Sequence, residues 1–178
     1  EYCLAEGGNV TRVAGQVKFA SVQSREKVSR GIELTAVGPS GHGSAPLAGM
    51  AIVQLSKAVA ALSDWRVPFT FNDTTREFFR LMATVSSPED AARYRAVLGN
   101  DAAAAAAAHD FFQKNEPRNA SMLHTSISPT IIAGGYRSNV IPSEAKATLD
   151  VRMMPDEDPA EFLAAVQRVI NNPAVTAR

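Results

Sequence analysis

Two segments in which apolar and polar residues alternate constrain the fold of this chain most. Residues 29–37 place Ile32, Leu34 and Ala36 between polar neighbours, and residues 144–152 repeat the pattern with an apolar side chain at every second position. Alternation of this kind is typical of a strand with one buried and one exposed face. We therefore predict two half-buried strands whose apolar faces must be covered by other elements.

A segment with helical periodicity follows each of these strands. Apolar side chains recur at helical spacing from Pro46, which suits the first turn of a helix, to about Ser63. A second helix opens at Asp158, directly before a proline, and the Asn-Asn-Pro sequence that begins at Asn171 stops it. Each predicted strand is thus followed by a helix that can cover it.

Three other segments carry strand signals. Residues 125–133 are rich in β-branched side chains and end at a Gly-Gly pair, a last strand begins at about Ala174, and residues 16–23 also have a strand-like repeat. Read from residue 29, the order is strand, helix, helical stretch, strand, strand, helix, strand. This order predicts an α+β fold of the split βαβ (ferredoxin-like) type, with a four-stranded antiparallel sheet and two helices on one face.

The long stretch at residues 64–123 has no strand signal and is expected to be a helical insert. Residues 75–85 and 88–98 have helical character, and Ser87 suits the N-cap of the second segment. A run of seven alanines at 102–108 forms a helix at low cost, and we expect that helix to face solvent.

Composition excludes several classes of function. The chain of 178 residues has 18 basic and 18 acidic residues, so its formal net charge is zero and it has no electrostatic attraction for nucleic acid. An RNA-binding sheet is further disfavoured by strands that lack an exposed aromatic pair. The charged residues are spread too evenly for a membrane span. Because Cys3 is the only cysteine, an internal disulfide and a multi-cysteine zinc site are excluded.

The glycine-rich loop between the first alternating strand and its helix is the strongest local motif. It reads Gly-Pro-Ser-Gly-His-Gly-Ser-Ala-Pro and holds His42 among glycines. This sequence matches neither a phosphate-binding loop nor a nucleophile elbow. A histidine that must reach another surface needs such a low-bulk backbone, although a plain turn histidine explains the same residues. We expect His109 and His124 to be surface or packing residues.

Two further motifs are candidates for a site. The loop Gly-Gly-Tyr-Arg-Ser-Asn-Val-Ile-Pro ends at Pro142, and with Arg152 it suggests that Asn139 and Arg152 project at adjacent strand ends. An amide and a guanidinium there would suit a carboxylate or an amide carbonyl, while a simple hairpin connection is the alternative. Near the start, Glu6 precedes two glycines and is either a metal ligand or part of a turn.

Taken in order, these motifs resemble the zinc aminoacylase and carboxypeptidase family, which includes succinyl-diaminopimelate desuccinylase and glutamate carboxypeptidase. The resemblance covers about residues 1–175 and is most similar to the branch of N-acyl-amino-acid and Gly-X carboxypeptidases. It is carried by Glu-Gly-Gly (6–8), Val-Gln-x-x-Glu-Lys (22–27), Gly-His-Gly-Ser-x-Pro (41–46), Gly-Gly-x-Arg-x-Asn-Val-Ile-Pro (134–142), Leu-Asp-Val-Arg (149–152) and Pro-x-Glu-Asp (155–158).

The resemblance implies a role for each candidate residue. Glu6 matches a ligand of the second zinc ion, next to Ala5 where the family often has Asp. His42 matches the histidine of the lid domain that crosses a dimer interface to hydrogen-bond the substrate carbonyl. Asn139 matches a residue that lines the same site, and Arg152 matches the arginine that binds the substrate carboxylate.

The resemblance also implies how this chain relates to a whole enzyme. Residues 1–27 would be a remnant and connector from the catalytic domain, and residues 28–178 the lid or dimerisation domain with its insert at about 64–123. Both ends of the chain have the appearance of cuts, because it begins without Met and ends in a strand-like sequence. The family's remaining zinc ligands and its general base are not in these residues, so we expect the fragment alone to hold no zinc and to be inactive.

Two functions from different classes follow. The first is the lid and dimerisation domain of a zinc-dependent hydrolase that holds two zinc ions and cleaves the amide bond of an N-acyl amino acid or short peptide. In that case, residues 29–63 would supply an edge strand and a helix that pair with a second copy. The alternative is a stand-alone split βαβ module that binds a protein or a small ligand.

Overall fold

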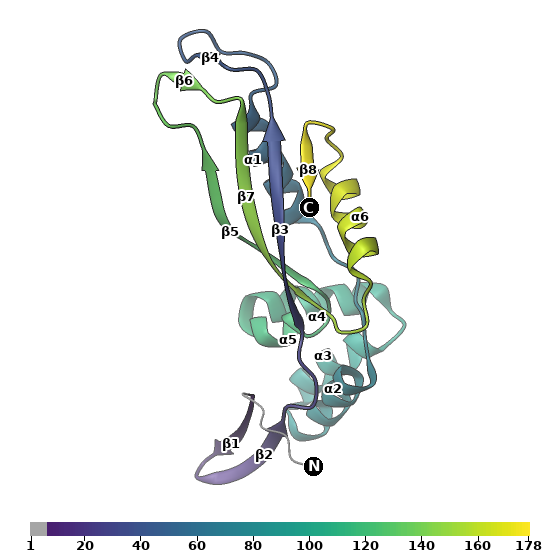
Figure 1. Ribbon diagram of the computed structural model, residues 1–178. Helices are drawn as coiled ribbons and strands as arrows, with labels where there is room; N and C mark the ends of the chain where they lie inside the picture. The colour runs from purple at the N-terminus through teal and green to yellow at the C-terminus, as the bar shows by residue number, and fades with distance from the viewer. Residues whose placement is uncertain (1–6) are drawn as a thin grey trace, which may run out of the picture. The chain divides into compact units, whose positions relative to one another are not determined.

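A computed structural model of the chain describes residues 7–178 (Figure 1). The chain divides into two compact units. Lys27–Pro68 and Thr125–Arg178 form the sheet unit, and Phe69–His124 form the helical part of the other unit, which also includes the N-terminal segment up to Glu26.

The sheet unit is built on a four-stranded antiparallel sheet. Its strands are β3 (Val28–Val37), β5 (Ser126–Gly134), β7 (Glu144–Met153) and β8 (Val175–Ala177), in the spatial order β5-β7-β3-β8. All four strands were predicted, and the predicted α+β class is confirmed.

Two helices and one face of this sheet form the core of the unit. These are α1 (Ala51–Asp64) and α6 (Pro159–Ile170), which pack against each other and against the strands. Every second residue is buried from Ile32 to Ala36 in β3 and from Ala145 to Met153 in β7, and Leu34 and Leu149 are completely so. They share one hydrophobic cluster with Leu55 of α1 and Val166 of α6. The alternation in the sequence therefore marks the face that the helices cover.

The two helices differ in how well their starts were predicted. At α6, the Asp158 side chain accepts hydrogen bonds from two backbone N–H groups of the first turn, and Asn171 ends the helix in the left-handed conformation with φ of 44°. Both features agree with the prediction. At α1 the predicted start at Pro46 is wrong, because Gly49 has a φ of 75° and Met50 has a ψ of 134°, which is not helical, so the helix begins only at Ala51.

The position of β3 in the sheet corrects another expectation. Residues 29–37 were predicted to serve as an edge strand for pairing with a second copy. Instead, β3 pairs with β7 on one side along its whole length and with β8 on the other. Among the described strands, β5 and β8 are the edges of this sheet. Alternation identifies a strand, but it does not specify the strand's neighbours.

The second unit contains the predicted helices α2 (Asp73–Val85), α3 (Pro88–Leu98) and α4 (Ala102–Asn115). It also contains the short α5 (Pro117–Ser121), which was not predicted as a separate helix. Ser87 caps α3 as predicted, since its side chain accepts a hydrogen bond from the Asp90 N–H. The rings of Phe79, Tyr94 and Phe112 pack together in the core of these helices, with centroids 5.5–6.2 Å apart, and Phe112 stacks on the other two.

The alanine-rich helix α4 is not wholly exposed, so the expectation of a solvent-facing helix is wrong for one side. Ala105, Ala108, His109 and Phe112 are buried. Their spacing of three or four residues places them on a single face. The Nε2 atoms of His109 and His124 lie 3.1 Å apart, which agrees with a packing role.

The chain before the sheet unit forms a hairpin of which only one strand was predicted. Here β1 (Gly8–Val13) pairs antiparallel with β2 (Gln16–Val22). Ala14 and Gly15 connect the strands and both have positive φ, of 51° and 81°. The Ala-Gly turn and the valines before it were the overlooked signal.

Candidate functional site

The two motif loops of the sheet unit meet beyond the ends of the long strands. We call this region, residues 38–50 and 135–143, the tip (Figure 1). Two short strands lie in it: β4 (Gly41–His42) follows β3, and β6 (Val140–Ile141) precedes β7. They pair antiparallel, with His42 opposite Val140. The Gly43 N–H also donates to the Asn139 carbonyl over 2.8 Å. The structure thus brings His42 and Asn139 together.

Close backbone packing in the tip explains one of its glycines. A Cβ on Gly43 would lie 3.4 Å from the Asn139 backbone, which is an ordinary van der Waals contact, so space alone does not require glycine there. A Cβ on Gly38 would lie only 2.3 Å from the carbonyl oxygen of Gly49, where the chain approaches α1. The Gly38 N–H meanwhile donates to the Ser143 carbonyl over 2.9 Å. Gly38 therefore ties both halves of the tip to the start of the helix.

His42 is exposed, and its ring is held by Ser44. Its Nδ1 lies 2.8 Å from Ser44 Oγ and 3.2 Å from the Ser44 backbone nitrogen. The His42 carbonyl accepts from the Ala45 N–H over 3.0 Å, which closes the turn after β4. The imidazole is thus oriented locally and remains accessible at the surface.

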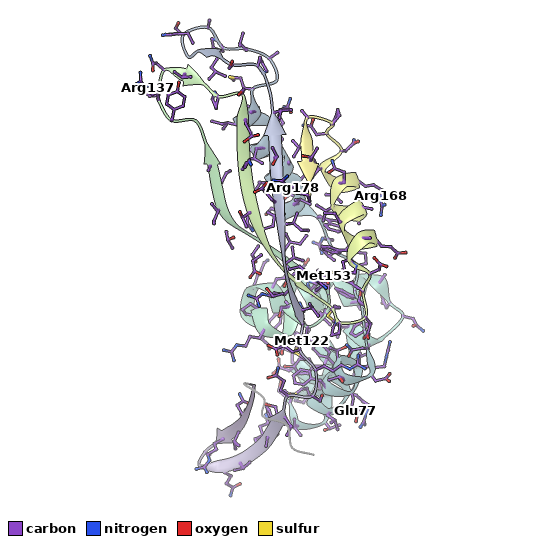
Figure 2. All side chains as sticks on the ribbon, in the orientation of Figure 1. Glu77, Met122, Arg137, Met153, Arg168 and Arg178 are labelled. Carbon is purple, nitrogen blue, oxygen red and sulfur yellow. The ribbon has the colours of Figure 1, made fainter. Side chains whose placement is uncertain are left out.

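Arg152 does not lie near His42 and Asn139. It lies near the far end of β7, where it pairs with Ser29 of β3 and Ser126 of β5. It lies eight positions after the first residue of β7, Glu144, and at about 3.4 Å per position this is a span of roughly 27 Å. Figure 2 shows the same separation, with Arg137 labelled at the tip and Met153, next to Arg152, at the opposite end of β7.

The expectation that Asn139 and Arg152 occupy adjacent strand ends is therefore wrong. Asn139 precedes β7 and Arg152 is the ninth of its ten residues, so most of the length of the strand separates them. Arg152 is exposed, and its Nε donates to Asp150 Oδ2 over 3.1 Å on the same face of the strand. Its guanidinium is accessible to a ligand at this end of the sheet.

A group of polar side chains near Arg152 was not foreseen. The buried Thr125 accepts from the Met154 N–H over 2.8 Å and donates to the carboxylate of Glu157. Lys27 Nζ donates to Ser126 Oγ over 3.4 Å. Burial lowers the pKa of Lys27 to about 8, although the negative charge of Glu157 opposes the shift. Lys27 is the last residue of the Val-Gln-x-x-Glu-Lys motif, and this motif was the sequence signal that could have indicated the polar group.

The lowered pKa of Lys27 predicts how stability depends on pH. In the unfolded chain the amine has its usual pKa of 10.5, so between pH 8 and 10.5 the unfolded state binds the extra proton. The free energy of unfolding is therefore expected to rise with pH from about 8 to 10, by about 1 kcal/mol after allowance for solvent screening. Urea unfolding of wild type and Lys27→Met at several pH values measures this rise.

Lys27→Met removes the titrating amine and should abolish the rise, while a rise of equal size in that variant would contradict the assignment. The comparison is best kept below pH 10. Burial, reinforced by the Glu116 carboxylate, raises the pKa of Tyr94 above its usual 10.0. Folded Tyr94 then keeps its proton where the unfolded chain loses it, so stability falls above that pH.

An apolar surface at the sheet edge was also missed. Ile131 and Ile132 of β5 are 60% and 61% exposed, and Ile52 and Val53 of α1 are 41% and 40% exposed. The two elements lie in contact, since a Cβ on Gly134 would be 3.0 Å from Ile52 Cγ1. We call these four side chains the edge surface. Ile131 and Ile132 lie within the segment predicted as a strand, but only the strand order shows that they are at an edge.

The predicted metal ligand Glu6 lies outside the described residues. Among residues 7–178, no group of three or more His, Cys, Asp or Glu side chains is placed to hold a metal ion. The described part of the chain also has no helix with the length and apolarity to cross a membrane.

Comparisons with known proteins agree with the motifs. A family model described as a peptidase dimerisation domain matches residues 25–178. A curated protein of Dictyostelium discoideum, named probable carboxypeptidase S-like 2, is 29% identical over 164 residues, or 88% of this chain and 29% of that protein.

Solved structures with a similar chain include two peptidases. An M20 family metallo-carboxypeptidase from Sulfolobus solfataricus is 18% identical, with a TM-score of 0.48 over 86% of this chain and 43% of its own. The di-peptidase Dug1p from Saccharomyces cerevisiae is 15% identical, with a TM-score of 0.46 over 86% of this chain and 36% of its own. This chain therefore spans less than half the length of each relative.

Proposed function

Because the chain belongs to the peptidase dimerisation domain family, we propose that it is the lid and dimerisation domain of a zinc-dependent peptidase or amidohydrolase. The substrate class is an N-acyl amino acid or a short peptide, whose amide bond the full-length enzyme cleaves. The observation that carries the proposal is the pairing of His42 with the Asn139 loop at an exposed tip. This arrangement suits polar groups that act on another surface.

The domain organisation belongs to the same proposal. We assign residues 28–178 to the lid, with residues 64–123 as its helical insert, and residues 1–27 to a connector from the catalytic domain. The strand order β5-β7-β3-β8 and the packing of α1 and α6 on the sheet support a split βαβ arrangement for the lid.

We further propose that the edge surface forms the contact between two copies of the chain. An edge strand presents unpaired backbone groups, and β5 of a second copy would satisfy them about a two-fold axis. Ile132 pairs with the buried Ala147 and would then be buried together with Ile52 of the adjacent helix, whereas Ile131 would be covered on the opposite face of the joined sheet. Exposed apolar side chains on both elements support this choice of interface.

Ile132→Glu is expected to convert the dimer into a monomer, because it places a carboxylate on an apolar contact and, by two-fold symmetry, places it there twice. Sedimentation velocity of the full-length protein at micromolar concentration measures the change. Leu81→Glu is a matched control, since Leu81 is also an exposed apolar residue, at 48%, but belongs to the helical unit. A dimer that survives Ile132→Glu, or one that Leu81→Glu also dissociates, would rule out this interface.

The two ends of the sheet would serve different active sites. A small N-acyl amino acid is much shorter than the roughly 27 Å that separates the tip from Arg152 in one chain. In a dimer, the tip would reach the partner's site, where His42 hydrogen-bonds the carbonyl oxygen of the scissile amide and Asn139 lines the pocket. Arg152 would bind the substrate carboxylate at the site of its own chain.

The residues described here do not fit a metal site by themselves, so zinc would be held mainly by the rest of the enzyme. Its chemistry there would be activation of a water molecule for attack on the amide. His42 would contribute separately, by stabilising the negative charge that develops on the carbonyl oxygen.

A substrate panel with the full-length protein tests the proposal. N-acyl amino acids and dipeptides are expected to be hydrolysed, and a chelator is expected to abolish the reaction until zinc is restored. A full-length protein that hydrolyses none of them, but binds a protein or small ligand through this unit, would favour the stand-alone module.

A further inference from the structure

The hydrogen bonds around His42 determine which of its ring nitrogens carries the proton. A neutral imidazole has one N–H donor and one acceptor nitrogen. The Ser44 backbone N–H can only donate, and it points at His42 Nδ1 over 3.2 Å. Nδ1 must therefore accept, and the proton of the neutral ring is on Nε2.

The Ser44 hydroxyl acts in the same sense. Oγ lies 2.8 Å from Nδ1, and because Nδ1 already accepts from the backbone, the hydroxyl donates to it as well. Within residues 7–178, the ring makes no hydrogen bond through Nε2. The Nε2–H donor is thus presented at the exposed side of the tip.

This arrangement is the opposite of the one that makes a histidine a general base. In a Ser-His-Asp triad, a carboxylate accepts from Nδ1–H and leaves Nε2 as the proton acceptor. The two segments of the tip contain no Asp or Glu, and the charged residue they do contain, Arg137, is a cation. His42 is therefore prepared to donate a hydrogen bond and not to remove a proton.

We propose that Ser44 is a positioning residue that fixes His42 as an Nε2–H hydrogen-bond donor. The tautomer follows from the contacts within this chain alone. The use of that donor on the substrate carbonyl rests on the function proposed above. These two parts can therefore fail separately.

Nuclear magnetic resonance of this chain labelled with nitrogen-15 reads the tautomer directly. At alkaline pH, His42 should show an unprotonated Nδ1 and a protonated Nε2, and His42→Gln identifies its signals among the three histidines. Ser44→Ala should broaden or shift the Nδ1 signal, and Ser44→Thr, which keeps the hydroxyl, should restore it. A protonated Nδ1 in the wild-type chain would overturn the proposal whatever the enzyme does.

Kinetics of the full-length enzyme test the use of the donor. Ser44→Ala should lower kcat about three- to tenfold with little change in KM, the size expected for one hydrogen bond, and Ser44→Thr should recover it. An unchanged kcat in Ser44→Ala would contradict the positioning role of the hydroxyl.

A matched pair of variants at position 42 identifies the nitrogen that donates. The Gln amide reaches the position of Nε2, whereas the Asn amide reaches that of Nδ1. His42→Gln should therefore retain at least tenfold more activity than His42→Asn. The reverse order would refute donation through Nε2. Equal and full activity in both variants would instead refute the proposed role of His42 and leave the tautomer intact.

Discussion

Replacing His42 by Ala in the full-length enzyme is expected to lower kcat by about 10²–10³-fold, equivalent to about 3–4 kcal/mol of transition-state stabilisation. The Nε2–H would meet the carbonyl oxygen only as that oxygen becomes negative, so the loss should appear in kcat more than in KM. Steady-state kinetics with the best substrate of the panel measures it.

Structural damage is separable from this effect. His42 is exposed, and its backbone in β4 is held by β6, so His42→Ala should unfold at the same temperature as wild type and remain a dimer. Near-normal kcat in a folded dimer would show that this histidine does not act on the substrate.

Mixing two inactive variants is expected to restore activity. In a dimer of His42→Ala with Arg152→Ala, one site would combine an intact Arg152 from its own chain with an intact His42 from the partner. The other site would lack both. Random exchange makes about half of the dimers mixed, so activity should rise to about a quarter of wild type. Activity is measured after the two variants exchange subunits.

Each variant alone, taken through the same exchange, is the control and should stay inactive. If His42 and Arg152 of one chain served the same site, no mixed dimer would contain an intact site, and activity would not recover. Recovery that persists when Ile132→Glu is added to both variants would also contradict the proposed interface.

The fold of the sheet unit was predictable because its sequence is locally consistent. Alternation in β3 and β7, the Asp158 cap and the Asn171 stop each specify a local structure that the tertiary packing preserves. The start of α1 was less predictable. Pro46 is a good first-turn residue, but the chain needs Gly49 in a left-handed conformation to turn from the tip into the helix.

The candidate site was predictable only in part, for a physical reason. His42 and Asn139 lie in breaker-rich loops that follow and precede long strands, so antiparallel pairing brings them together. The separation of Arg152 from Asn139 depends on the length and direction of β7. The exposure of Ile131 and Ile132 depends on which strand is outermost. Neither property is visible in local periodicity.

The length of β7 has a consequence for how such enzymes can diverge. The number of residues in the strand sets the distance between the tip and Arg152, and the strand is paired with β3 along all ten residues. Inserting one residue would turn every later side chain to the other face, whereas two would keep the faces and lengthen the span by about 7 Å. Insertions that lengthen the distance between the tip and Arg152 without disrupting the sheet should therefore come in steps of two residues. They should occur in β3 and β7 at the same time.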